Sequence, residues 1–235
     1  MLNANDPACV IDFSSMNRSQ PRCIPALRYG WLTALYDPVL RVTLREQTFK
    51  IRLIEQAVVK PGRNILDLGC GTATLTLLIK KLHPETPVVG LDADPKALAI
   101  ARAKCAQSRL DVGLDVGLSM QLPYPDRYFH RVLSSLFFHH LTLENKRRTL
   151  EGVFRALRAN GELHVADWGK PQNRFMRAAF LLVQMLDGFE TTSGNVKGEL
   201  PETFRNAGFI EVRESLRYMT VLGTLSLYQA RKPNA

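Results

Sequence analysis

Short apolar runs and longer amphipathic segments alternate along most of the chain. Runs with the length and composition of buried strands lie at 64–68, 87–91, around 110–118, 129–136 and 162–168. Segments with apolar residues at helical spacing separate several of them, at 72–82, 95–107 and 143–158. Strands separated by helices of this length predict a parallel sheet with right-handed crossovers.

The C-terminal part of the chain has a different pattern. The sequence predicts a helix at 174–189, a shorter helix at 200–208 and two adjacent strands within 209–232 that form a hairpin. An antiparallel hairpin on the edge of an α/β sheet is a common mixed arrangement. The longer helix is apolar around its whole circumference from Ala178 to Leu186. Core burial, a wall of a substrate pocket and a contact in a homodimer are all consistent with that pattern.

The N-terminal part also departs from the alternation. Residues 1 to about 25 are polar and lack periodicity, so we expect a mobile arm or a lid that becomes ordered on binding. The following segment predicts two helical stretches, and the second ends at Pro61 and Gly62. We therefore divide the chain into an N-terminal mobile arm and helical lid at 1–60 and a main domain at 61–235.

Length and composition indicate one globular domain with a modest appendage, since the chain has 235 residues. No apolar run approaches the ~20 residues that span a bilayer, and the first residues lack the pattern of a secretory signal. The four cysteines form no C-x-x-C pair and no zinc-site spacing: Cys9, Cys23, Cys70 and Cys105. We expect reduced thiols in a cytoplasmic protein, with no metal site.

The net charge of +9 would suit a nucleic-acid partner, but its distribution does not. Lys and Arg are scattered along the chain, often beside acids. The densest run, Lys146 to Arg148, lies in a predicted helix and is interpreted as a solvated helix face. We therefore expect no nucleic-acid partner.

The candidate chemistry begins at 65–73, where the apolar strand ends in a turn through Gly69 and Gly71. Such a turn is typical of nucleotide-binding folds, yet Thr74 replaces the third glycine of the dinucleotide pattern and Asp67 precedes the turn. A carboxylate about 5 Å from a phosphate would cost roughly 3 kcal/mol at an effective dielectric constant near 20. Asp67 therefore favours a ligand with a cationic group, and S-adenosylmethionine (SAM) has both an ammonium and a sulfonium.

A second acid supports a nucleoside ligand. Asp92 ends the next strand, about 20 residues after the glycine turn, where a carboxylate can accept both ribose hydroxyls. This acid suits NAD as well as SAM, so it does not choose between them.

Five segments in order resemble the class I SAM-dependent methyltransferases, in particular the small-molecule branch that includes the ubiquinone and menaquinone biosynthesis type. The similar segments are 65–75, 88–102, 122–141, 153–168 and 204–212, within a resemblance that covers roughly residues 29 to 231. The resemblance implies a Rossmann-like, doubly wound, seven-stranded and mostly parallel sheet with a C-terminal antiparallel hairpin strand. It also makes 61–235 the SAM-binding methyltransferase domain.

The resemblance also implies a set of cofactor-binding residues. They are Asp67, Gly69, Cys70 and Gly71 at the methionine part, Asp92 and Ala93 at the ribose and adenine, Ser119 and Met120 at the base, and Ser135 and Leu136 near the transferred methyl. Tyr36 matches a position that often covers the cofactor, with core packing as the alternative.

Two histidines follow the fourth strand, where a general base could reach an acceptor. His139 and His140 are the candidates, and the alternative is that one packs against the following helix while the other is solvated. The leading interpretation is methyl transfer from SAM, without metal, to a small and partly apolar acceptor, with S-adenosylhomocysteine as the product. The rivals are a nucleic-acid methyltransferase, an NAD(P)-dependent oxidoreductase and a SAM-binding protein without catalysis. The acceptor atom and the oligomeric state stay open.

Overall fold

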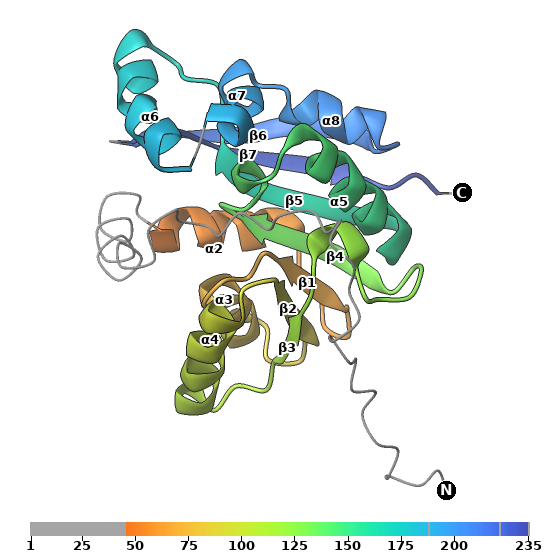
Figure 1. Ribbon diagram of the computed structural model, residues 1–235. Coiled ribbons are helices and arrows are strands. Elements are labelled where there is room, and N and C mark those ends of the chain that lie inside the picture. Colours follow the sequence, from red (N-terminus) through yellow and green to blue (C-terminus); the bar gives the residue numbers. More distant parts are fainter. Residues whose placement is uncertain (1–45, 188, 221, 235) are drawn as a thin grey trace, which may run out of the picture.

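The computed structural model describes residues 46–187, 189–220 and 222–234 (Figure 1). Within this part of the chain, seven strands form one sheet in the order β3-β2-β1-β4-β5-β7-β6. They are β1 Ile65–Leu68, β2 Val88–Asp92, β3 Gly113–Val116, β4 Phe129–Ser135, β5 Leu157–Trp168, β6 Ile210–Thr220 and β7 Gly223–Arg231. The first five pair in parallel, whereas β7 is antiparallel to β5 and to β6. The predicted seven-stranded, mostly parallel fold is confirmed.

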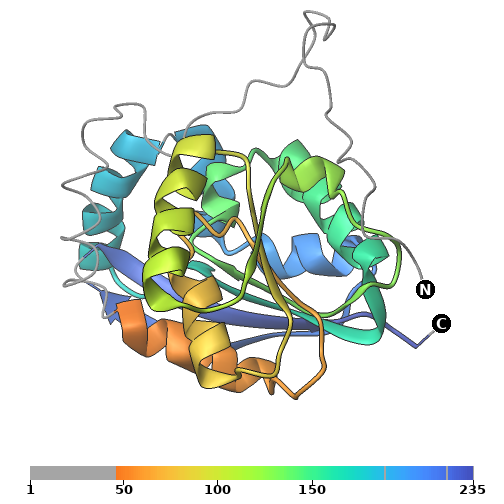
Figure 2. The same ribbon diagram turned by 90° about the horizontal axis from the view of Figure 1, so that it is seen from below.

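Helices lie on both faces of this sheet, as Figure 2 shows. They are α2 Glu46–Ala57, α3 Thr74–Leu82, α4 Pro95–Ser108, α5 Leu143–Ala156, α6 Arg174–Asp187, α7 Phe189–Lys197 and α8 Leu200–Asn206. The boundaries follow from local chemistry. Pro95 begins α4 after Asp94, whose carboxylate accepts the Lys96 amide, and the Thr142 hydroxyl accepts the Asn145 amide at the start of α5.

Two hydrophobic clusters hold the helices to the sheet. Alternate residues of β1 divide between them, because successive side chains of a strand point to opposite faces. Ile65 packs with residues of α2 and α3, whereas Leu66 packs with residues of α5 and α8. Asp67 alternates with Leu66, so its side chain points to the face that α2 and α3 cover.

The segment before the sheet divides into a described and an undescribed part. Helix α2 packs on β4 and β5 and buries Phe49, Leu53 and Ile54 in the core. The predicted boundary at residue 60 falls in the turn that follows this helix. The predicted mobile arm, and Tyr36 with it, lies outside the described residues.

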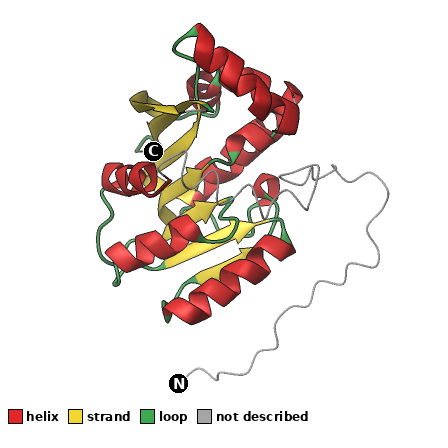
Figure 3. Cartoon of the chain, turned by 90° about the vertical axis from the view of Figure 1, so that its left-hand side faces the viewer, coloured by secondary structure: helices red, strands yellow, loops and turns green. Residues whose placement is uncertain are grey.

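The long apolar segment of the C-terminal half forms α6 and the start of α7, which are among the helices drawn red in Figure 3. Phe180 of α6 is buried, and its ring lies 5.4 Å from that of Trp168 at the end of β5. Leu181, the next residue, is 41% exposed. Part of this segment therefore packs in the core. No helix among the described residues has the length and apolarity needed to cross a bilayer.

Candidate active site

The carboxyl ends of β2, β1, β4 and β5 lie next to one another in the sheet. The chain moves outward from β1 to β2 and β3 and then returns to β4 on the other side of β1. This is the topological switch point at which open α/β sheets bind their ligands. The sequence-predicted acids at 67 and 92 and the histidines at 139 and 140 come from these ends.

The turn after β1 depends on both of its glycines. Gly69 and Gly71 have φ angles of +71° and +53°, in the left-handed region that glycine adopts at no steric cost. A Cβ on Gly69 would lie 2.2 Å from the Phe137 ring, so that position also lacks room for a side chain. A Cβ on Gly71 would meet no atom within 4 Å. The space beside Gly71 is therefore open to a ligand.

Asp92 ties this turn to the end of β2. Its Oδ2 accepts the Gly71 amide at 2.7 Å and its Oδ1 accepts the Asp94 amide at 2.9 Å. Burial raises the pKa of Asp92, and the two amides oppose that shift. The carboxylate is half-buried, and each oxygen has a second lone pair with which it could accept a ligand hydroxyl.

Asp67 is buried, with 1% of its surface exposed. Its Oδ2 accepts the Thr76 hydroxyl at 2.6 Å. Its Oδ1 is buried and has no hydrogen-bond partner among the described residues. Loss of water raises the pKa of Asp67 to about 6, although Thr76 and the charge of Lys50 oppose the shift. A buried carboxylate oxygen that lacks a donor fits a cationic ligand group.

The remaining predicted cofactor residues take different positions. Cys70 is buried, and burial raises the pKa of its thiol, so it is packed and protonated. Ala93 is exposed beside Asp92. The Ser119 hydroxyl lies 2.8 Å from that of Thr149 in α5, whereas Met120 is half-buried. The Ser135 hydroxyl is buried and has no partner among the described residues, and Leu136 turns the chain with a φ angle of +55°.

His139 forms a buried pair with Asp167, the penultimate residue of β5. His139 Nδ1 lies 2.8 Å from Asp167 Oδ1, and 4% of the His139 surface is exposed. The Asp167 carboxylate also accepts the backbone amides of His139 and Trp168. Burial alone would raise the pKa of Asp167, but the neighbouring His139 and these hydrogen bonds lower it below its ordinary value. Asp167 is therefore ionised at neutral pH, and a neutral His139 has its proton on Nδ1 and a lone pair on Nε2.

His140 lies beside this pair, with its ring centroid 3.9 Å from that of His139. Burial and the adjacent His139 hold the pKa of His140 well below its ordinary range. It is therefore neutral at pH 7. Unlike His139, it has no carboxylate partner among the ion pairs of the described residues.

Comparisons with known proteins find a methyltransferase domain in this chain. Residues 65–161 match the family model of a methyltransferase domain. A demethylmenaquinone methyltransferase from Symbiobacterium thermophilum is 28% identical over 205 residues, which cover 76% of this chain and 80% of that protein. An uncharacterized methyltransferase from Synechocystis is also 28% identical over 205 residues, with 87% and 92% covered.

The chain contains a methyltransferase domain. The solved structure of the [4+2]-cyclase SpnF shares the fold, with a TM-score of 0.65 and 19% identity over 80% of this chain and 81% of that one. Because that neighbour is called a cyclase, the fold alone does not determine the reaction. The methyltransferase assignment therefore rests on the family match and the sequence relatives.

The methyltransferase contains a buried polar chain that sequence reasoning missed. Lys146 Nζ donates to Asn195 Oδ1 at 2.8 Å, and Asn195 Nδ2 donates to the Trp168 carbonyl at 2.9 Å and lies 3.4 Å from Asp167 Oδ1. The interpretation of Lys146 as part of a solvated helix face is wrong, because 5% of its surface is exposed. Adjacent residues of a helix point to different faces, so Lys146 is buried although the next residue, Arg147, is exposed.

Among the described residues of the methyltransferase, no three His, Cys, Asp or Glu side chains are grouped so that they could hold a metal ion.

Proposed function

We propose that this methyltransferase transfers the methyl group of SAM to a small, partly apolar acceptor, with His139 as the general base. When bound, SAM supplies an electrophilic methyl group on a sulfonium. The observation that carries the proposal is the position of two different groups at one edge of the sheet. The penultimate residue of β1, Asp67, has a buried carboxylate oxygen without a donor among the described residues. After β4, the His139 ring is held by the carboxylate of Asp167.

The residues of the crevice fit the parts of SAM. Asp67 would hold the ammonium group, because its Oδ1 needs a donor and its buried charge needs a cation. Asp92 would accept the ribose hydroxyls while it keeps the Gly71 amide. The open space beside Gly71 allows a ligand to approach the backbone closely, and Ala93 and Met120 offer apolar surface to the adenine.

His139 would take a proton from the acceptor at Nε2. Asp167 orients the ring through Nδ1 and stabilises the imidazolium that forms when the proton arrives. Its own pKa is lowered, so Asp167 stays ionised and does not itself receive that proton. A positioned base of this kind contributes about 10²–10⁴-fold to the rate of an acceptor whose hydroxyl must be ionised.

The acceptor is proposed to be a hydroxylated aromatic ring of the quinol type. One relative is a demethylmenaquinone methyltransferase. The reduced form of a quinone is a quinol, which has the hydroxylated ring proposed here. Leu136 and Phe137 are half-buried after β4 and could contact such a ring. Phe138 and Trp168 are buried in the two core clusters, so they would pack beneath the acceptor and not against it.

Labelled-methyl transfer from SAM tests this function. Reduced naphthoquinones, phenols, thiols, amines and tRNA would be offered to the wild-type protein and to His139→Asn. We expect label on a quinol or phenol, and a large loss of that label in the variant. Label on tRNA alone would contradict the acceptor class while leaving methyl transfer in place.

A further inference from the structure

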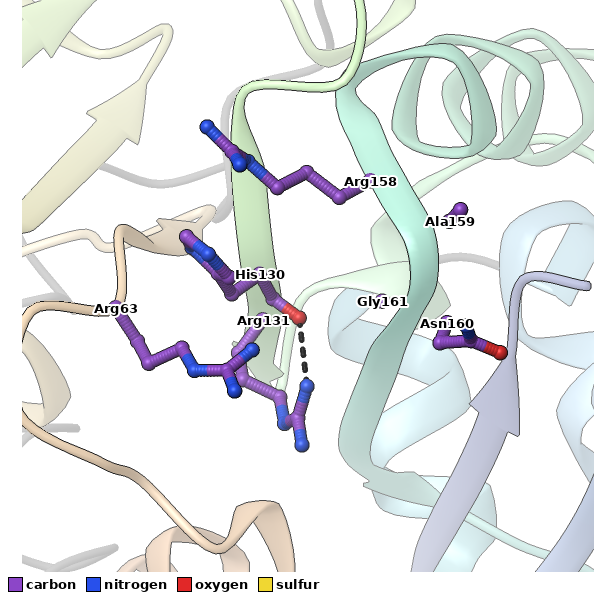
Figure 4. A pocket seen from close by; sticks show the side chains of 7 residues that line it. All are labelled: Arg63, His130, Arg131, Arg158, Ala159, Asn160 and Gly161. Carbon is purple, nitrogen blue, oxygen red and sulfur yellow. Dashed lines mark hydrogen bonds between the residues drawn. The ribbon is translucent and has the colours of Figure 1, made fainter. Parts of the chain in front are cut away.

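A basic recess opens at the end of the sheet opposite the cofactor crevice (Figure 4). Its volume is about 250 Å³, and it lies at the amino ends of β1, β4 and β5. The lining residues are Arg63, His130, Arg131, Arg158, Ala159, Asn160 and Gly161. Three of the seven are arginines, one is a histidine and none is acidic.

The cationic groups of the recess lie close enough to influence one another. Burial lowers the pKa of His130, and the charges of Arg158, Arg63 and Arg131 lower it further. Figure 4 shows the side chains of Arg63, His130 and Arg131 side by side, with Arg158 extending toward them from β5. Like charges held together in this way repel, so the recess is a place where an anion would be stabilised.

Arg131 is partly neutralised and fixed by the protein itself. Its Nε donates to the Ala57 carbonyl at 2.8 Å and lies 3.4 Å from Glu162 Oε2. The Arg131 guanidinium is therefore already engaged by groups of the protein. The charges left to meet a ligand are those of Arg63 and Arg158.

Arg63 and Arg158 have no acidic partner among the residues that line the recess. Several other arginines have an acid within 4.0 Å, as in the pairs Arg52–Glu55, Arg155–Asp126 and Arg217–Glu214. Within the described part of the chain neither Arg63 nor Arg158 forms such an ion pair, although both line the same recess. The missing counter-charge at a concave site is the observation that points to a ligand.

We propose that this recess binds the phosphate groups of a small molecule, of the size of a pyrophosphate or a nucleotide phosphate tail. Planar guanidinium groups can each donate two hydrogen bonds to phosphate oxygens. His130 Nδ1 accepts the Asn64 amide at 3.1 Å, so a neutral ring has its proton on Nε2 and can donate to the same anion. The site is a recess instead of an extended basic stripe, which favours a small anion over a nucleic-acid backbone.

Inorganic pyrophosphate is the probe. It would be titrated into the full chain by calorimetry and by NMR of the His130 ring, with the variants Arg63→Gln and Arg158→Gln. Arg102→Gln is the control, because Arg102 is exposed on α4 and lies outside the recess. We expect each recess variant to weaken binding by roughly tenfold, with no change for the control. The bound anion should also raise the pKa of His130.

Two results would overturn the proposal. The first is pyrophosphate binding that is absent, or that both recess variants leave unchanged. The second is a short oligonucleotide that binds more tightly than pyrophosphate and is lost in the same two variants, since the recess would then be part of a nucleic-acid surface. Circular dichroism of each variant confirms that the fold is retained before either result is interpreted.

Discussion

At the scale of single residues, the proposed chemistry depends on the pair of His139 and Asp167. Replacing His139 by Asn removes the base and should lower kcat by about 10²–10⁴-fold, while the dissociation constant of SAM stays the same. His140→Asn is the matched comparison. His140 lacks a carboxylate partner among the ion pairs of the described residues, so we expect a much smaller loss. Equal losses in the two variants would contradict the assignment.

Asp67 should make SAM binding depend on pH. The ligand-free carboxyl has a pKa of about 6, raised by burial, and an ammonium group beside it would lower that pKa. Binding then favours the ionised form, so affinity is full above about pH 7 and falls as pH drops through 6. The loss between pH 7 and pH 5 should be about tenfold. Calorimetric titrations across this range check it, and Asp67→Asn should flatten the curve.

At the scale of elements, helix α7 depends on buried polar contacts. Thr192 and Asn195 are buried on it, and Asn195 joins Lys146 of α5 to the end of β5. Asn195→Leu removes one acceptor of the Lys146 ammonium and the Asn195 donor to the Trp168 carbonyl. The free energy of unfolding should therefore fall by about 1–3 kcal/mol. Urea denaturation measures the change. Lys197→Ala, at an exposed position of the same helix, should stay within about 0.5 kcal/mol of the wild type.

Elements with a strong apolar period could be predicted from the sequence. The strands at 65–68 and 129–135 and the helix at 95–108 agree with their predicted ranges to within a residue or two. Helix α7 could not be predicted, because "FETTSGNVK" has few apolar residues and contains Gly194. Its polar residues are buried against α5 and β5, and such tertiary contacts are not visible in a local pattern.

The candidate site shows the same limit. The glycine turn and the acids at 67 and 92 could be found, since each lies within or directly after the last two residues of an apolar strand. The partner of His139 could not, because Asp167 lies 28 positions away and the pairing of β4 with β5 brings the two together. The available signal was an acid near the end of a predicted strand, in "HVADW".

At the scale of the whole molecule, the sheet separates two kinds of site. The carboxyl ends of its central strands hold the acids and the histidine pair, whereas the amino ends of β1, β4 and β5 hold the basic recess. This polarity follows from parallel strands, whose equivalent ends meet at one edge. The net charge of +9 therefore does not describe the crevice at the carboxyl ends, where the carboxylates of Asp67 and Asp92 lie.

Calorimetric titration of SAM and NADH into the wild-type protein, Asp92→Ala and Asp92→Asn tests the central claim most directly. Asp111→Ala is the control, since Asp111 is exposed before β3. We predict that SAM binds and NADH does not. Asp92→Ala should weaken SAM binding by about 1.5–3 kcal/mol. Asp92→Asn should weaken it less, because Asn keeps one acceptor for the Gly71 amide. NADH binding more tightly than SAM, or an unchanged SAM dissociation constant in Asp92→Ala, would contradict the account.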